Sequence, residues 1–231
     1  MGILSFDDSG YGDELMAGLL VTISLAVLGF ALALALGVVL GVMALSHNRL
    51  MRAFWRTYAS IFMGVPTLLI IFFLFYNAPT IVKAITTVNF NPSPFSVGVA
   101  SLCLVYAAYV GEVIRGAVLN VPVGQFEAAR ALGIHKFHLW WFVILPQAWR
   151  IALPGCTNVW MALLKDTALV SLVGLTDVVR MAYVASGATK MPFLFYAFAG
   201  LSFIVFSGVT MLGAERFERW VGRGQGRAKG F

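Results

Sequence analysis

The sequence predicts an all-α, polytopic membrane protein, a bundle of five transmembrane helices with no second domain. Of its 231 residues, 60% are hydrophobic and 11% are charged, whereas soluble domains carry about 25% charged residues. Several uncharged runs exceed the roughly 18 residues that mark a candidate transmembrane helix. A soluble fold could not bury this much apolar surface, so we expect the lipid bilayer to be the main solvent.

The first uncharged segment runs from Leu15 to Leu45. It is too long for the apolar core of a signal peptide and follows acids rather than bases, so we expect it to remain in the membrane. Gly37 and Gly41 lie one turn apart, and this spacing would let another helix approach closely. Glycine is also simply common in membrane helices, which is the alternative interpretation.

The second segment, 57–78, contains Pro66. Proline removes a backbone hydrogen bond, so we expect a kink or a break there. The third segment starts near Phe95 and ends with Glu112 and Arg115. These two charges can pair at i,i+3 spacing and reach water at the helix end, where we expect a structural role near the cytoplasmic rim.

The fourth segment starts near Ile151, reaches Lys165 and Asp166, and continues without charge over 167–176. The fifth spans 191–214 and follows a connection that we expect to be partly helical. Five crossings result, which places the two termini on opposite sides of the membrane.

Charge in the loops predicts the orientation. The arm 1–14 contains acids and no base. Basic residues follow the first, third and fifth segments: Arg49, Arg52 and Arg56; Arg115, Arg130, Lys136 and Arg150; Arg216, Arg219, Arg223, Arg227 and Lys229. Because bases favour the cytoplasmic side, we expect a periplasmic arm, a transmembrane domain over 15–220, and a basic cytoplasmic tail over 221–231 that can contact lipid.

The net charge of +6 does not predict nucleic-acid binding, because the basic residues flank apolar runs and have no stacking aromatics among them. Cys103 and Cys156 lie in apolar segments without ligand spacing, so we expect neither a disulfide nor a metal site. His135 and His138 share a helical face but have no third ligand nearby, which favours a surface helix.

The longest cytoplasmic connection, about 124–147, has an unusual composition. The alanines of Glu127-Ala128-Ala129 would let a short helix pack closely, Gly133 would permit a sharp reversal, and Pro146 would stop what precedes it. Composition alone leaves two interpretations open, a docking element or an ordinary interfacial helix.

The spacing in this connection resembles the EAA loop of ABC importer permeases. Glu127-Ala128-Ala129 is followed after three residues by Gly133, and after nine more by Val143-Ile144-Leu145-Pro146, with Val143 in place of the family's isoleucine. The resemblance covers about residues 15–220. Segments 152–155 and 165–179 are similar to the subgroup that imports histidine, lysine, arginine, ornithine or opines such as octopine and nopaline.

The resemblance implies that this loop forms a coupling helix that docks on an ATP-binding subunit. The implied coupling residues are Glu127, Ala128, Ala129, Gly133, Leu145 and Pro146. It further implies two ATP-binding subunits that hold ATP and Mg²⁺, a second permease, and a periplasmic substrate-binding protein that delivers the amino acid or opine. The subgroup usually pairs two different permeases, so we expect a heterodimer rather than a homodimer.

Two features qualify the resemblance. The chain has no Walker sequence, so we expect no nucleotide, no cofactor and no enzymatic activity of its own. The family's arginine before Gly-x-Pro is replaced by Met63, so a role of that arginine does not carry over to this chain. We expect the partner permease to supply the missing charge.

Lys165 and Asp166 are the strongest site candidates outside the loop. A charge at a helix centre costs about 2.5–3.5 kcal/mol, and adjacent helical residues point about 100° apart, so the two cannot fully satisfy each other. With Asn158 and Thr167 they predict a substrate pathway or gate. The alternatives are an ion pair at a subunit interface and, for Asn158, a hydrogen bond between helices.

Two other function classes would require sequence features that this chain does not show. A membrane enzyme would need a nucleophile with its base or a metal constellation, and neither G-x-S-x-G nor H-E-x-x-H occurs. An ATP-independent secondary transporter would usually show inverted repeats, which five segments without internal symmetry do not provide.

Overall fold

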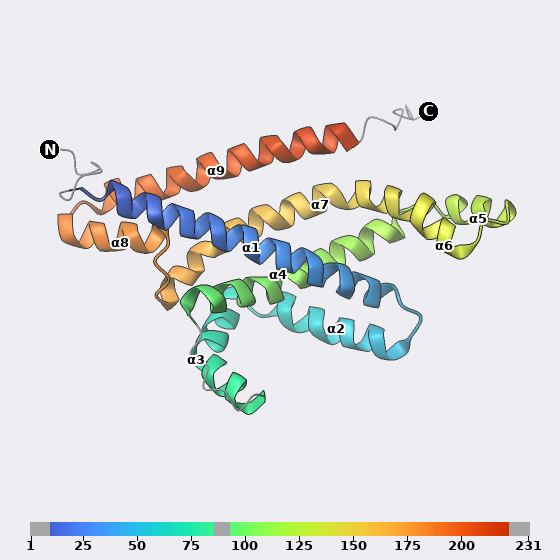
Figure 1. Ribbon diagram of the computed structural model, residues 1–231, viewed down its shortest axis with the longest axis horizontal. Coiled ribbons are helices and arrows are strands. Elements are labelled where there is room, and N and C mark those ends of the chain that lie inside the picture. Colours follow the sequence, from blue (N-terminus) through green and yellow to red (C-terminus); the bar gives the residue numbers. More distant parts are fainter. Residues whose placement is uncertain (1–9, 86–92, 222–231) are drawn as a thin grey trace.

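The computed structural model describes residues 10–85 and 93–221, and these two ranges form helices and no strand (Figure 1). In chain order the elements are α1 Gly12–Leu45, α2 Arg49–Gly64, α3 Thr67–Ile85, α4 Pro94–Leu119, α5 Val123–Ala131, α6 Lys136–His138, the π-helix η1 Leu139–Ile144, α7 Leu145–Asp166, the 3-10 helix η2 Thr167–Val173, α8 Val178–Thr189 and α9 Pro192–Val221. Most of the expected arm (1–14) and tail (221–231) lies outside the described residues.

Five helices in the described part of the chain are long and apolar enough to cross a membrane. They are Gly12–Leu45, Thr67–Ala84, Pro94–Leu119, Lys136–Val173 and Pro192–Val221. The predicted number of membrane helices is therefore confirmed, while several boundaries differ from the expected ones.

The core lies where α1, α4 and α7 meet. Leu25 of α1, Leu102 of α4 and Leu163 of α7 are all fully buried in one apolar cluster. On the α1 side, the two expected glycines touch α4, because a Cβ on Gly37 would lie 2.5 Å from Val110 and one on Gly41 would lie 2.9 Å from Ile114. The predicted close helix approach is confirmed.

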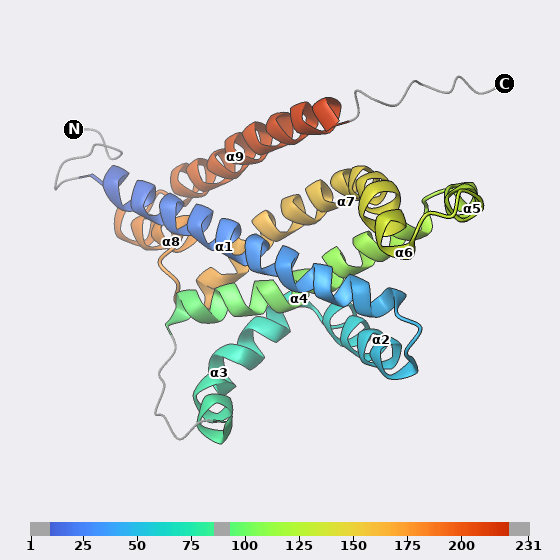
Figure 2. The same cartoon turned by 45° about the vertical axis from the view of Figure 1, so that its right-hand side comes forward.

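The expected second segment, 57–78, is not one helix. α2 ends at Gly64, Val65 is extended with φ −97° and ψ 133°, and α3 starts at Thr67. Pro66 causes this break, because it lacks an N–H and disfavours helical backbone in the residue before it. The membrane-spanning part is 67–84, and α3 turns away from α2 in both views (Figures 1 and 2).

α2 packs along α4 instead of crossing separately. Trp55 is buried and fills the space over Gly111, where a Cβ would lie 2.8 Å from its ring. Tyr58 donates a hydrogen bond of 2.7 Å from its hydroxyl to the carbonyl oxygen of Leu104. Met63, in the last turn of α2, is exposed.

The fourth membrane helix begins before the expected Ile151. The helical path is continuous from Lys136 through η1 into α7, so Pro146 does not end what precedes it. Proline occupies the first turn of α7, where its missing N–H costs little. Beyond Asp166 the path tightens into η2, and the connection that follows holds α8, as expected.

The basic loops gather at one end of the bundle. In both views the α1–α2 connection, α5 with α6 and the end of α9 lie at the right, while the start of α1 and the α8–α9 connection lie at the left (Figures 1 and 2). Arg52 lies in the first turn of α2, Lys136 begins α6, and Arg219 lies in the last turn of α9. The three loops whose basic residues predict a common side of the membrane therefore lie at the same end of the bundle.

Orientation can be tested by thiol labelling in a chain cleared of its two natural cysteines. Single cysteines at Lys83 and Lys190 should react with an impermeant maleimide added to intact spheroplasts, because we expect these ends to face the periplasm. Cysteines at Arg52 and Lys136 should react only after permeabilisation. Labelling at Arg52 in intact spheroplasts would contradict the predicted orientation.

Candidate functional site at the α5 loop and on α7

The loop between α4 and α7 is built around a left-handed turn at Gly133. Gly133 has φ +68°, its N–H donates to the carbonyl of Arg130 (3.0 Å), and the N–H of Ile134 donates to that of Ala129 (3.0 Å). These two bonds form a Schellman cap, which closes α5 and reverses the chain. The expected reversal at Gly133 is confirmed.

The inner face of α5 packs on the bundle through one small residue. Ala129 is 4% exposed and lies in an apolar cluster with Val118, Val121, Leu139 and Ile144. A larger side chain at this position would push α5 away from α4 and η1, so Ala129 holds the short helix close to the bundle.

The outer face of α5 is exposed and consists mostly of small residues. Gly124, Glu127, Ala128 and Ala131 share this face and are all exposed. Small residues let another surface approach the backbone closely. Glu127 adds one carboxylate, which makes no hydrogen bond or ion pair with the described residues.

Leu145 and Pro146 lie at the base of the loop, apart from this outer face. Both are exposed, and they follow η1 directly. The coupling residues expected from the sequence therefore separate into an outer face on α5, a buried contact at Ala129, a turn at Gly133 and a junction at 145–146.

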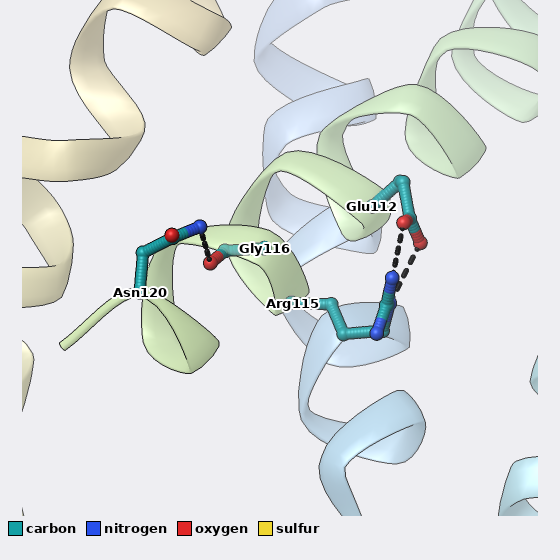
Figure 3. A network of polar contacts seen from close by, with 4 residues as sticks. All are labelled: Glu112, Arg115, Gly116 and Asn120. Carbon is teal, nitrogen blue, oxygen red and sulfur yellow. Dashed lines mark hydrogen bonds and ion pairs between the residues drawn. The ribbon is translucent and has the colours of Figure 1, made fainter. Parts of the chain in front are cut away.

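Glu112 and Arg115 form the expected i,i+3 pair near the end of α4 (Figure 3). The Arg115 Nε donates to Glu112 Oε2 at 2.8 Å, and a second nitrogen contacts Oε1. One turn further, the Asn120 side chain donates to the carbonyl of Gly116 at 2.8 Å and caps the helix (Figure 3). This end of α4 is stabilised locally, which agrees with a structural role.

The polar residues expected on the fourth segment do not lie together. Asn158 and Lys165 are exposed and seven residues apart, about two helical turns, so they share one face of α7 with Ala162. Asp166 instead points to α4, where Tyr106 donates a hydrogen bond of 2.9 Å to its Oδ2. Thr167 is buried and donates to the carbonyl of Leu164.

Lys165 and Asp166 form no ion pair in the described structure. One faces outward and the other is held by Tyr106, as the 100° between adjacent helical positions predicts. The exposed face of α7 with Asn158 and Lys165, here called the α7 face, is therefore the polar surface that a partner or a substrate could reach.

Sequence reasoning missed a polar junction between α1 and α8. Asp177 is fully buried and caps α8, with the N–H of Arg180 donating to its Oδ1 at 2.9 Å. Thr22 accepts a hydrogen bond from the N–H of Val178, and a Cβ on Gly18 would lie 2.9 Å from the Asp177 backbone. The available signal was an aspartate directly before a helix, which is typical of an N-cap.

The Asp177 carboxyl lies in an apolar setting, and its Oδ2 has no hydrogen-bond partner in the described part of the chain. Burial raises the pKa of Asp177 to about 6, against the opposing effect of the backbone N–H groups at the start of α8. The negative charge is therefore costly in the folded protein at neutral pH.

The comparisons with known proteins agree with this architecture. The chain belongs to the family of binding-protein-dependent transport system inner membrane components, whose family model matches residues 33–223. It is 38% identical over 228 residues to the nopaline transport system permease protein NocQ of Agrobacterium fabrum, with 96% of this chain and 97% of that protein covered.

A second relative is the histidine/lysine/arginine/ornithine transport system permease protein HisQ of Escherichia coli, 35% identical over 205 residues that cover 87% of this chain and 90% of HisQ. Among solved structures, a chain of an amino acid ABC transporter with histidines superposes with a TM-score of 0.81 and 29% identity, covering 90% of this chain and 94% of that one. The sequence-based resemblance to permeases of this subgroup is confirmed.

Replacement of Asp177 tests the cost of its charge. The folded-state pKa is raised, so the native state binds the proton more tightly than the unfolded chain, and stability falls as pH rises from the ordinary value of 3.8 through about 6. Asp177→Asn keeps an N-cap oxygen and removes the charge, so it should raise the thermal midpoint at pH 7 by several degrees and flatten its pH dependence.

The measurement is thermal unfolding of the purified protein in detergent between pH 5 and pH 8, with Asp13→Asn, an exposed aspartate at the start of α1, as the control. A lower midpoint for Asp177→Asn across this range would show that the native carboxyl is stabilised as an anion.

Proposed function

We propose that this chain is the membrane-spanning permease subunit of a binding-protein-dependent ABC importer in a bacterial inner membrane. It would move a polar or basic amino acid, or an opine, into the cytoplasm. ATP and Mg²⁺ would bind to two partner subunits, because this chain has no Walker sequence. The names of its relatives, a nopaline permease and a histidine/lysine/arginine/ornithine permease, support the substrate class.

The observation that carries this proposal is the outer face of α5. A short helix projects from the end of the bundle that carries the basic loops, and it presents Gly124, Ala128 and Ala131 with the carboxylate of Glu127 (Figure 1). Its position is set on the inner side by Ala129 and at its end by Gly133. A short helix that is anchored on one side and presents small residues on the other can transmit motion from an ATP-binding subunit, as a coupling helix.

The substrate pathway is proposed to run along the α7 face. The described residues leave this face open, so a second permease would form the opposite wall, a paralogue rather than a second copy. A periplasmic substrate-binding protein would supply the substrate from the other end of the bundle. Asp166 and Tyr106 would hold η2 against α4 beside the pathway, and Lys165 would face the substrate or the partner.

Gly133→Val tests the coupling role of the loop. A β-branched residue reaches φ +68° only with strain, about 1–3 kcal/mol. A Cβ at Gly133 would meet no atom within 4 Å, so the strain comes from the backbone alone. We expect normal membrane abundance but a loss of at least about tenfold in uptake and in the stimulation of ATP hydrolysis by loaded binding protein.

Two control variants separate backbone strain from general damage. Gly133→Asn should retain activity, because asparagine tolerates the left-handed region. Gly187→Val places the same side chain in open space in α8, outside the loop, and should behave as wild type. Full stimulation of ATP hydrolysis in Gly133→Val would show that this loop does not transmit the motion.

Lys165→Met tests the pathway role of the α7 face. Removing the charge should reduce uptake strongly while the complex still purifies and hydrolyses ATP at its basal rate. Tyr106→Phe removes the hydrogen bond to Asp166, and Asp166→Asn weakens it by removing the charge, so both should reduce uptake, Tyr106→Phe through the bond alone. Lys83→Met, at the end of α3, is the matched control and should transport normally.

Loss of assembly in Lys165→Met, measured by copurification of the subunits, would assign Lys165 to an ion pair at the permease interface. Normal uptake in both Lys165→Met and Asp166→Asn would remove the pathway proposal. Uptake by the purified chain without ATP or partners would favour a secondary transporter.

A further inference from the structure

A buried carboxyl joins α1 to α8 at the end of the bundle opposite the basic loops (Figure 1). Asp177 lies directly before α8 and four residues after η2, which continues the helix that carries Lys165. At its other end α8 leads into α9. Neither the coupling proposal nor the pathway proposal uses this junction, yet a movement of α8 away from α1 would displace the segments that lead to η2 and to α9.

The backbone around Asp177 touches the backbone side of α1 directly. A Cβ on Gly18 would lie 2.9 Å from the carbonyl carbon and oxygen of Asp177 and from the nitrogen of Val178. The hydroxyl of Thr22 accepts a hydrogen bond from the N–H of Val178 at 3.3 Å and donates one to the carbonyl of Gly18 at 3.0 Å. Since not even a methyl group fits between them, α1 and α8 either meet fully or separate, as closely packed interfaces do.

Apart from this contact, α8 is held by a small apolar cluster. Its buried residues are Val178, Ala182 and Ala185. They pack with Leu15 of α1 and Phe195 of α9, in a cluster separate from the main core where α1, α4 and α7 meet. Two of the three are alanines, which bury little apolar surface. Separation of α8 from α1 therefore leaves the main core intact.

The Asp177 carboxyl has no charged partner on the elements that pack against it. Its Oδ1 accepts the N–H of Arg180 at 2.9 Å, and its Oδ2 has no hydrogen-bond partner in the described part of the chain. The guanidinium of Arg180 lies over the ring of Tyr183, 5.4 Å from its centroid.

The other titratable groups at this end of these elements do not pair with the carboxyl either. η2 contains no titratable side chain. The remaining groups are Tyr11, Asp13 and Glu14 at the start of α1, Lys190 after α8, and Tyr196 in α9, and none forms an ion pair with Asp177. While α8 is docked on α1, a proton is therefore the ligand that can neutralise this carboxyl.

We infer that the junction between α1 and α8 is a proton-controlled latch, closed when the Asp177 carboxyl is protonated and released when it is ionised. A carboxylate with an unpaired oxygen is far costlier to keep from water than a neutral carboxyl, and separation of α8 from α1 admits water.

The raised pKa of Asp177, about 6, has the sign that this latch requires. The docked state binds the proton more tightly than a hydrated carboxyl with the ordinary pKa of 3.8, so low pH favours the closed latch. This preference is lost as pH rises from 3.8 through about 6. Because this end is expected to face the periplasm, the latch would respond to external acidity, a role in transport that rests on the proposed function.

The test is the distance between α1 and α8, measured by double electron–electron resonance on the protein in lipid nanodiscs with its copurifying subunits. Spin labels are attached to cysteines at Leu20 and Val184, both exposed, in a chain cleared of its natural cysteines. At pH 5 we expect one short distance. At pH 8 a second, longer distance should appear and lower the short-distance population at least about twofold.

Two variants should fix the latch in opposite states. Asp177→Asn keeps an N-cap oxygen without a charge, so the short distance should persist at both pH values. Gly18→Ala places a methyl group 2.9 Å from the Asp177 backbone, so the longer distance should dominate at both. The matched controls are Asp13→Asn, at an exposed aspartate, and Gly187→Ala, at a glycine with open space around it, and both should keep the wild-type pH dependence.

Two results would overturn the inference. The first is a wild-type distance distribution that is the same at pH 5 and pH 8. The second is a pH dependence that persists in Asp177→Asn, because another group would then be titrating. The distance measurement does not need uptake, so a latch that fails in a protein that still transports is distinguishable from a failure of the proposed function.

Discussion

The close contact between α1 and α4 is the constraint on which the rest of the structure depends. Lipid is as apolar as the helices, so helix association in a bilayer relies on close packing rather than on the hydrophobic effect. Gly37 and Gly41 allow this packing, because their missing side chains leave room for Val110 and Ile114. With α1 and α4 locked together, α2 packs on one side through Trp55, and α7 completes the core on another.

The membrane helices differ widely in how much of their surface the chain itself covers. In the most apolar window of α4, 56% of residues are buried, whereas α3 and α9 reach only 11% each. Much of the surface of α4 is thus covered by the chain itself, whereas most of the surface of α3 and α9 is left to contact lipid or partners. The proposed second permease would cover the polar face of α7, which this chain leaves exposed.

The features that could be predicted from the sequence are those set by the hydropathy of long segments or by a single proline or glycine. Hydropathy found the five spans, and Pro66 and Gly133 were correctly interpreted as a break and a reversal. The sequence could not show that α2 lies along α4, because Trp55 and Tyr58 contact residues of α4 that are distant in the sequence. Spacing predicted that Lys165 and Asp166 point apart, but not which of them faces α4, since that depends on Tyr106, 60 residues earlier. Asp177 was missed because nothing in its local sequence reveals burial.

The π-helix η1 adds a geometric property to the junction between the loop and the bundle. A π-turn holds one more residue than an α-turn, and such turns are frequent at functional sites. Because it holds one extra residue, such a turn leaves the helix beyond it rotated by about 100° relative to an unbroken α-helix. Residues 139–144 therefore set the rotational phase between α6 and α7, and with it the direction in which Asn158 and Lys165 face.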